Sequence, residues 1–294
     1  MSQEDSKQQE LPIRMGNHGQ LLKSKSTSGE DLKYAYEAYL RYRRTTSGLK
    51  VRDEESVRKL VEAYNTYRKE VVYLFEKRKN SGQEGLRSSM LEELFADLFG
   101  DLVADILTTS LERVVLGKAN SYVSLTFTPQ SFTALFSSPG PSIHTKDQDF
   151  VLGCLTQISV APVGASDDER QSENTVIPVL AIECKTYLER NMLDSCAGTA
   201  RRIKEANPYC LYIVAADYIK MDEAYPELTH IDEVFILCKA TNSARLENRA
   251  KEIEPHPIDA ELIVDLFQMV KCHFNRIWWD PQNALDRGRI IGRP

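Results

Sequence analysis

Two apolar runs separated by a polar segment dominate the middle of the chain. Residues 151–163 and 176–184 are rich in β-branched and apolar residues, whereas residues 164–175 are mostly polar and turn-favouring. Runs of the first kind are typical of strands, and a polar segment with Gly, Ser, Asp and Asn is typical of a turn. The pattern therefore predicts an antiparallel β-hairpin.

The predicted hairpin brings three charged residues together at its open end. The midpoint between Asp149 and Cys184 falls inside the turn, so the pairing places Asp149 beside Glu183 and Lys185. Side chains alternate between the two faces of a strand, so Glu183 and Lys185 project together, and Ile182 and Cys184 project from the opposite face. Two carboxylates and an ammonium group are thus expected at one end of a sheet.

Amphipathic helices are predicted before the hairpin. Apolar residues and tyrosines recur at helical spacing after Ser28 and again through residues 53–79, which predicts two helices packed against each other. Residues 86–116 carry a broader apolar stripe, with Ser88 or Ser89 as the N-cap. A helix of this apolar character is expected to lie against the sheet.

Helical and strand patterns alternate in the rest of the chain. Residues 121–127 alternate like a strand, a helical face with small residues follows Lys185, and residues 209–216 and 234–238 are short apolar runs typical of strands. Residues 257–279 form a long amphipathic pattern typical of a helix. Together these elements predict an α/β (α+β) fold with a central mixed sheet and an additional N-terminal helical region.

Charge and composition narrow the class of protein. The net charge is −6, but residues 22–90 carry a net charge of +6, so the acidic chain as a whole is compatible with a local basic surface for nucleic acid. The six cysteines stand singly, which favours reduced thiols in a cytoplasm. No apolar run approaches the roughly 20 residues of a membrane span, and the N-terminus is too polar for a signal peptide. We therefore expect a cytoplasmic protein without a membrane segment.

The charged end of the hairpin has a chemical use. Two neighbouring carboxylates repel each other, and Mg²⁺ relieves the repulsion by taking oxygen ligands from both, with waters and a phosphate oxygen in its remaining positions. A lysine beside them can stabilise the charge that develops during phosphoryl transfer to water. The alternative is a simple salt bridge of Lys185 with Asp149 or Glu183 at a strand end. The apolar lead-in to Glu183 favours the catalytic interpretation, because buried charge is costly and usually functional.

Asp149 ahead of one apolar strand, with Glu183-Cys184-Lys185 closing another, resembles the signature of the PD-(D/E)xK nuclease superfamily. Within it, the segments KDQDFVLG and IECKTYLERNMLDS resemble the type II restriction endonucleases that work as two different subunits on an asymmetric site, the BbvCI-like enzymes. The resemblance covers residues 86–239 and implies an αβββαβ core. It also implies Mg²⁺ held by Asp149, Glu183 and the backbone carbonyl of Cys184, with Lys185 orienting or activating the attacking water.

Two choices between neighbouring residues stay open at this site. The resemblance implies a glutamate from the helix before the hairpin, and Glu92 is preferred to Glu93 because it follows the apolar Leu91, which is expected to be buried. A glutamate that merely favours the N-terminus of a helix is the alternative. Asp149 is preferred to Asp147 because it abuts the strand directly, which assigns Asp147 to the preceding loop.

In this interpretation the chain divides into a flexible N-terminal arm (1–28), a helical subdomain whose tyrosines and arginines offer a contact to DNA or a partner (29–85), and a nuclease domain (86–294). The expected function is sequence-specific, Mg²⁺-dependent hydrolysis of double-stranded DNA, leaving 5′-phosphate and 3′-hydroxyl ends.

The resemblance implies that a single active site in this chain cuts one strand and that a second, non-identical subunit cuts the other. It also implies a cognate DNA methyltransferase that protects the bacterial host. The alternatives are a PD-(D/E)xK repair or junction nuclease acting as a homodimer, and a non-catalytic DNA-binding subunit.

Overall fold

The computed structural model describes residues 16–77, 84–107, 111–137, 139–164, 166, 170–275 and 280–288. The helices are α1 (Asn17–Lys25), α2 (Glu30–Thr46), α3 (Glu54–Lys77), α4 (Glu84–Ile106), α5 (Ala134–Ser137), α6 (Arg190–Ala206), α7 (Asn242–Ala250), α8 (Ala260–Phe274) and α9 (Pro281–Arg287). The strands are β1 (Val114–Phe127), β2 (Pro141–Val160), β3 (Gln171–Leu188), β4 (Leu211–Ile219) and β5 (Glu233–Thr241). Among the helices of these ranges, none is both long and apolar enough to cross a bilayer.

The strands of this part of the chain form one mixed sheet in the order β1-β2-β3-β4-β5. Strand β2 pairs antiparallel with both β1 and β3, whereas β4 pairs parallel with both β3 and β5. Helix α6 makes the crossover that the parallel pair β3 and β4 requires. In chain order α4, β1, β2, β3, α6 and β4 give the αβββαβ succession, which confirms the predicted fold class and its N-terminal helices.

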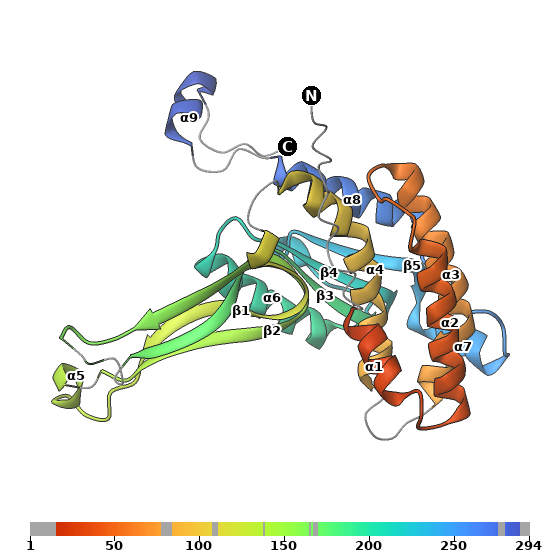
Figure 1. The fold of residues 1–294 in the computed structure, drawn as a ribbon, viewed down its shortest axis with the longest axis horizontal. Coiled ribbons are helices and arrows are strands. Elements are labelled where there is room, and N and C mark those ends of the chain that lie inside the picture. Colours follow the sequence, from red (N-terminus) through yellow and green to blue (C-terminus); the bar gives the residue numbers. More distant parts are fainter. Residues whose placement is uncertain are drawn as a thin grey trace, which may run out of the picture.

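The antiparallel strands are longer than the sequence predicted. Strand β2 begins at Pro141 and β3 begins at Gln171, so the paired region extends far beyond the apolar core. Figure 1 shows β1, β2 and β3 projecting from the helical part of the molecule as an arm with α5 near its tip. The predicted hairpin is therefore the inner part of a larger antiparallel unit.

A β-bulge sets the register at the inner end of β2 and β3. In the outer part of the arm, the strands pair so that the same register, continued inward, would place Asp149 opposite Ile182. The register shifts between Leu152 and Gly153, and Phe150 pairs with Ile182, so this inner register, continued by one residue, places Asp149 opposite Glu183. Bulges of this kind re-aim side chains, and here the shift brings the two carboxylates to the same face.

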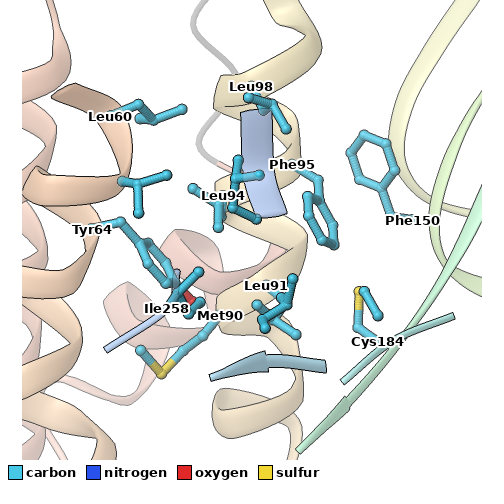
Figure 2. Close-up of a cluster of buried hydrophobic side chains, with 14 of the residues drawn as sticks. Leu60, Tyr64, Met90, Leu91, Leu94, Phe95, Leu98, Phe150, Cys184 and Ile258 are labelled. Carbon is cyan, nitrogen blue, oxygen red and sulfur yellow. The ribbon is translucent and has the colours of Figure 1, made fainter. Parts of the chain in front are cut away.

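Helix α4 lies between the sheet and the other N-terminal helices. Figure 2 shows α4 side chains between those of α3 and those of the sheet, with Leu94 and Phe95 near the centre of the cluster. The rings of Phe95 and Phe150 meet edge to face, with centroids 5.8 Å apart. Helix α6 covers the opposite face, where its Ala200 packs in one cluster with Tyr212 of β4. The two-sided cover explains why residues 176–182 of β3 and most of β4 are nearly continuous apolar runs.

The predicted pair of packed helices is confirmed as α2 and α3, but four of their tyrosines and two of their arginines face inward or pair within the protein. The tyrosines at 39, 42, 64 and 67 are all buried, so they are core residues and not a stacking surface for nucleic acid. Arg68 is 2% exposed and pairs with Asp217 at 3.0 Å. Arg43 pairs with Asp97 at 2.5 Å. These groups hold α2 and α3 to the rest of the protein.

Several boundaries differ from the prediction. Asn17–Lys25, expected within the flexible arm, forms α1, and its Leu22 is fully buried. Helix α4 begins upstream of the two serines expected to cap it and ends at Ile106, because the apolar run from Val114 onward continues as β1 rather than as helix. Residues 1–15 of the expected arm and 276–279 of the last predicted helix lie outside the described residues.

Gly153→Ala is expected to destabilise the protein by about 1–3 kcal/mol. A Cβ atom at this position would lie 2.4 Å from the Ile177 carbonyl oxygen and 2.6 Å from Val176 Cγ1. The carbonyl belongs to the paired strand, so it cannot move away without disturbing the bulge. Urea unfolding followed by circular dichroism measures the change.

Gly198→Ala in α6 is the matched control, because the added methyl group enters open space within a helix. This variant is expected to gain about 0.4–1 kcal/mol of stability. If the two substitutions changed stability equally, close packing at the bulge would not constrain the strand register.

Candidate active site

Asp149, Glu183 and Lys185 meet where the pairing of β2 with β3 ends, as predicted. Lys185 Nζ lies 2.7 Å from Glu183 Oε2 and 3.2 Å from Asp149 Oδ2. The backbone N–H of Cys184 donates to the same Asp149 oxygen at 2.9 Å. One ammonium group therefore bridges two carboxylates that lie on neighbouring strands.

Burial governs the electrostatics of Glu183. Its side chain is largely enclosed, and the Tyr212 hydroxyl donates to Oε1 at 3.3 Å. Burial raises the pKa of the Glu183 carboxyl, the Asp149 carboxylate adds to the rise, and the Lys185 ammonium opposes it. Cys184 projects to the other face and packs in the main core, as the strand alternation predicted (Figure 2).

Lys185 keeps its proton in this setting. Burial alone would lower the pKa of Lys185, but the attraction of Glu183 and Asp149 outweighs burial, and the pKa is raised above its ordinary value. At neutral pH the side chain is therefore a cation that donates hydrogen bonds. It is suited to orient an oxygen atom or to neutralise negative charge, and it is not suited to accept a proton.

Glu92 of α4 faces this group. The side chain is 4% exposed and accepts a hydrogen bond from Asn17 Nδ2 at 2.8 Å. Burial raises the pKa of Glu92 to about 7, the Asn17 hydrogen bond partly offsets the rise, and the carboxylate of Asp149 adds to it. A carboxyl group that titrates near neutral pH and feels Asp149 has the environment of a general base.

The neighbouring Glu93 points toward α2. It accepts a hydrogen bond from the Tyr39 hydroxyl at 2.7 Å and lies 3.5 Å from Arg43 Nη1. Glu93, Asp97, Asp101 and Asp105 recur at intervals of one helical turn, and each contacts α2 or the segment joining α2 to α3. Glu93 is thus the first member of an acidic stripe between helices, and the geometry supports the choice of Glu92 for the site.

Asp147 and Asp149 both lie within β2, so the expectation that Asp147 belongs to a preceding loop is wrong. The strand begins at Pro141, and Asp147 pairs with Asn120 of β1. Asp147 is exposed and forms an ion pair with Lys118 at 3.0 Å. Asp149, in contrast, contacts both Lys185 and Cys184 N–H, and the geometry supports it as the acid of the site.

Two residues near the site were missed in the sequence. Lys118 follows Gly117, whose φ of 129° accompanies a register shift in β1, and its ammonium lies close enough to Asp147, Glu92 and Asp149 to feel all three carboxylates. The isolated glycine within a strand pattern was the available signal. Asn17 gave no signal, because it stands in a polar segment that predicts disorder.

Asp149, Glu183 and the carbonyl of Cys184 offer the oxygen donors that magnesium takes. Mg²⁺ commonly binds one or two carboxylates and completes its octahedron with waters and substrate phosphates. Two carboxylates bridged by one ammonium fit such a cation, because a single positive charge does not balance two carboxylates. Among the residues that the structure describes, no cluster of three or more His, Cys, Asp and Glu side chains forms a metal site. The fit therefore depends on two carboxylates.

Comparisons with known proteins agree with the fold. The family model described as Bpu10I restriction endonuclease matches residues 83–290. A chain of the solved structure "native BbvCI A2B2 tetramer at low resolution" is similar to this chain with a TM-score of 0.61 at 19% sequence identity, over 88% of this chain and 97% of that chain. No curated protein matches the chain in sequence.

Glu92→Gln is expected to stabilise the metal-free protein by about 3 kcal/mol at pH 8 and to have little effect near pH 4.5. The pKa of Glu92 is raised from 4.5 to about 7, so the folded protein holds this proton more tightly than the unfolded chain, and stability falls as pH rises across that window. The amide introduced by Glu92→Gln does not ionise, so the variant does not lose this stability as pH rises. Urea unfolding between pH 4.5 and 8 measures the difference.

Glu37→Gln on the exposed face of α2 provides the control for removing one negative charge. Its effect on the free energy of unfolding should be small, because the side chain is exposed. If the free energy of unfolding of wild type and of Glu92→Gln depended on pH in the same way, the raised pKa of Glu92 would be contradicted.

Proposed function

The chain belongs to the Bpu10I restriction endonuclease family and is a type II restriction endonuclease, and from this premise we propose that it hydrolyses DNA at the site formed by Asp149, Glu183 and Lys185. The observation that carries the assignment is the ammonium of Lys185 bridging both carboxylates. This arrangement supports a centre in which two carboxylates lie beside one fixed positive charge. Hydrolysis of a phosphodiester can use the carboxylates to hold a divalent cation and the positive charge to neutralise the phosphate.

Asp149, Glu183 and the backbone carbonyl of Cys184 are the residues proposed to hold Mg²⁺. The bound cation would polarise a phosphoryl oxygen and lower the pKa of a coordinated water. The two carboxylates supply charge for the cation, and the Cys184 N–H keeps Asp149 oriented on β2.

The proposed role of Lys185 follows from its protonation. As a permanent cation it orients the attacking water by hydrogen bonding and neutralises the charge that grows on the phosphate. Glu92, whose pKa of about 7 allows both protonation states near neutral pH, is proposed to accept a proton from that water. In-line attack on phosphorus then leaves a 5′-phosphate and a 3′-hydroxyl.

The proposed assembly pairs this chain with a second, non-identical subunit. The described residues contain one such arrangement of carboxylates and lysine, and one arrangement suffices to cut one strand. The similar BbvCI structure is an A2B2 tetramer, which supports an enzyme built from two kinds of chain. We propose an asymmetric target, one strand cut by each subunit, a cognate methyltransferase that protects host DNA, and a bacterial cytoplasmic location.

Glu183→Ala is expected to abolish Mg²⁺-dependent cleavage of plasmid DNA by this chain, assayed alone and with the product of the neighbouring reading frame. The substitution removes one of the two carboxylates and leaves Lys185 with a single partner. Glu173→Ala, an exposed position in the outer part of the same strand, is the control and should retain cleavage.

Discrete fragments from wild type support restriction, whereas cleavage without a fixed site would favour a repair or junction nuclease. DNA binding without cleavage under all metal conditions would make this chain a non-catalytic subunit and would overturn the proposed mechanism.

Lys185→Ala in this chain, paired with an intact second subunit, is expected to convert the enzyme into a strand-specific nickase. Loss of the bridging ammonium should slow cleavage of one strand by about 10²–10³-fold, since single stabilising donors contribute on this scale. Denaturing gels with each strand labelled separately measure both rates. Undiminished double-strand cleavage would refute the division of strands between subunits.

A further inference from the structure

Helix α1 reaches the proposed active site through a single side chain. Asn17, its first residue, donates from Nδ2 to Glu92 Oε2 at 2.8 Å, although the two residues lie 75 positions apart in the sequence. Asn17 precedes the residues 83–290 that the family model matches. The contact therefore joins the N-terminal helical region to the catalytic part of the chain.

His18 fixes the position of α1 on α4. Its ring is fully buried, with Nδ1 2.9 Å from Ser89 Oγ and Nε2 2.6 Å from the Tyr67 hydroxyl. Burial lowers the pKa of His18 to about 3, so the ring is neutral, and both ring nitrogens lie within hydrogen-bond distance of a hydroxyl group. Ser89 lies one turn before Glu92 on α4, so seating His18 on Ser89 places the neighbouring Asn17 on Glu92.

Two glycines allow this close approach. A Cβ atom at Gly16 would lie 2.2 Å from Glu93 Oε2, and one at Gly19 would lie 2.2 Å from the Tyr39 hydroxyl oxygen. Backbone on both sides of Asn17 thus packs directly against side chains of α4 and α2. The segment Gly16-Asn17-His18-Gly19 has little freedom to slide, which gives the Asn17 amide a defined direction.

We propose that Asn17 is a positioning residue of the nuclease site, which holds the Glu92 carboxylate in the orientation needed for hydrolysis. The inference depends on the proposed function of Glu92. Among the described residues, the Asn17 amide fixes Oε2 of the buried Glu92 carboxylate, and the other oxygen can then face the attacking water. Without the amide, Glu92 rotates among its side-chain conformers and spends less time in the productive one.

Asn17→Ala is expected to slow the single-turnover cleavage rate by about 10–100-fold, the usual scale for a residue that orients an active-site ligand. The affinity for target DNA, measured without divalent metal, should change less than about twofold, because Asn17 orients Glu92 and is not proposed to contact DNA. Asn17→Asp, which has the same shape but no amide donor, should slow cleavage at least as much. Ser24→Ala on the exposed side of α1 is the control and should cleave like wild type.

A double-mutant cycle separates positioning from general support of the fold. In a Glu92→Gln background, Asn17→Ala should change the cleavage rate less than about twofold, because the group that Asn17 orients is already disabled. Urea unfolding of the four metal-free proteins provides a readout that does not depend on activity, and it should show that the two substitutions are coupled.

The outcomes distinguish the inference from the function that underlies it. A wild-type chain that cleaves, with Asn17→Ala and Asn17→Asp at the wild-type rate, would overturn the positioning role alone. Losses that multiply independently in the double mutant would also overturn it. A wild-type chain that never cleaves, even with its second subunit, would overturn the proposed function itself.

Discussion

The pairing of β2 with β3 is the constraint on which the site depends. Side chains alternate along a strand, so a slip of one residue would turn Asp149 away from Glu183 and send it toward the apolar face of Ile182. The bulge at Gly153 supplies the one-residue shift that brings the two acids opposite each other. The register of the outer arm alone would place Asp149 opposite Ile182. The bulge at the base of the arm is therefore needed to place it opposite Glu183.

Once the acids are brought together, the structure must stabilise charge that is largely removed from water. Lys185 offsets the repulsion of Asp149 and Glu183, and a pair of partly buried acids with a shared cation costs less than the same pair without one. Within the described part of the chain, Glu92 accepts its hydrogen bond from the neutral Asn17 amide, and its raised pKa reflects the remaining cost of burial. Destabilised groups of this kind concentrate at functional sites, where an arrangement that favours reactivity lowers the stability of the fold.

Local sequence patterns predicted the hairpin, because its strands and its turn are set by residues close together in the chain. Period-two alternation and a polar turn predicted Asp149 beside Glu183 and Lys185, although they did not predict the bulge that sets this register. The same reasoning extended one helix to residue 116, because an apolar run does not distinguish a buried helix from the start of β1. Helix α1 was missed for a different reason. Its residues are polar, and it is held by His18, whose partners Ser89 and Tyr67 come from distant elements.

The rotation of α4 about its axis decides which glutamate enters the site, and the helical region fixes that rotation. Asp97 accepts from Tyr42 and Arg43, Asp101 accepts from the backbone N–H of Val51, and Glu93 accepts from Tyr39. These acids share one face of α4, so their bonds to α2 and its following segment hold that face away from the sheet. Glu92, rotated about 100° from Glu93, then faces Asp149. A turn of α4 by one residue would exchange the two glutamates, and it would break every bond of the acidic stripe at once. The N-terminal helices therefore fix which glutamate of α4 faces Asp149.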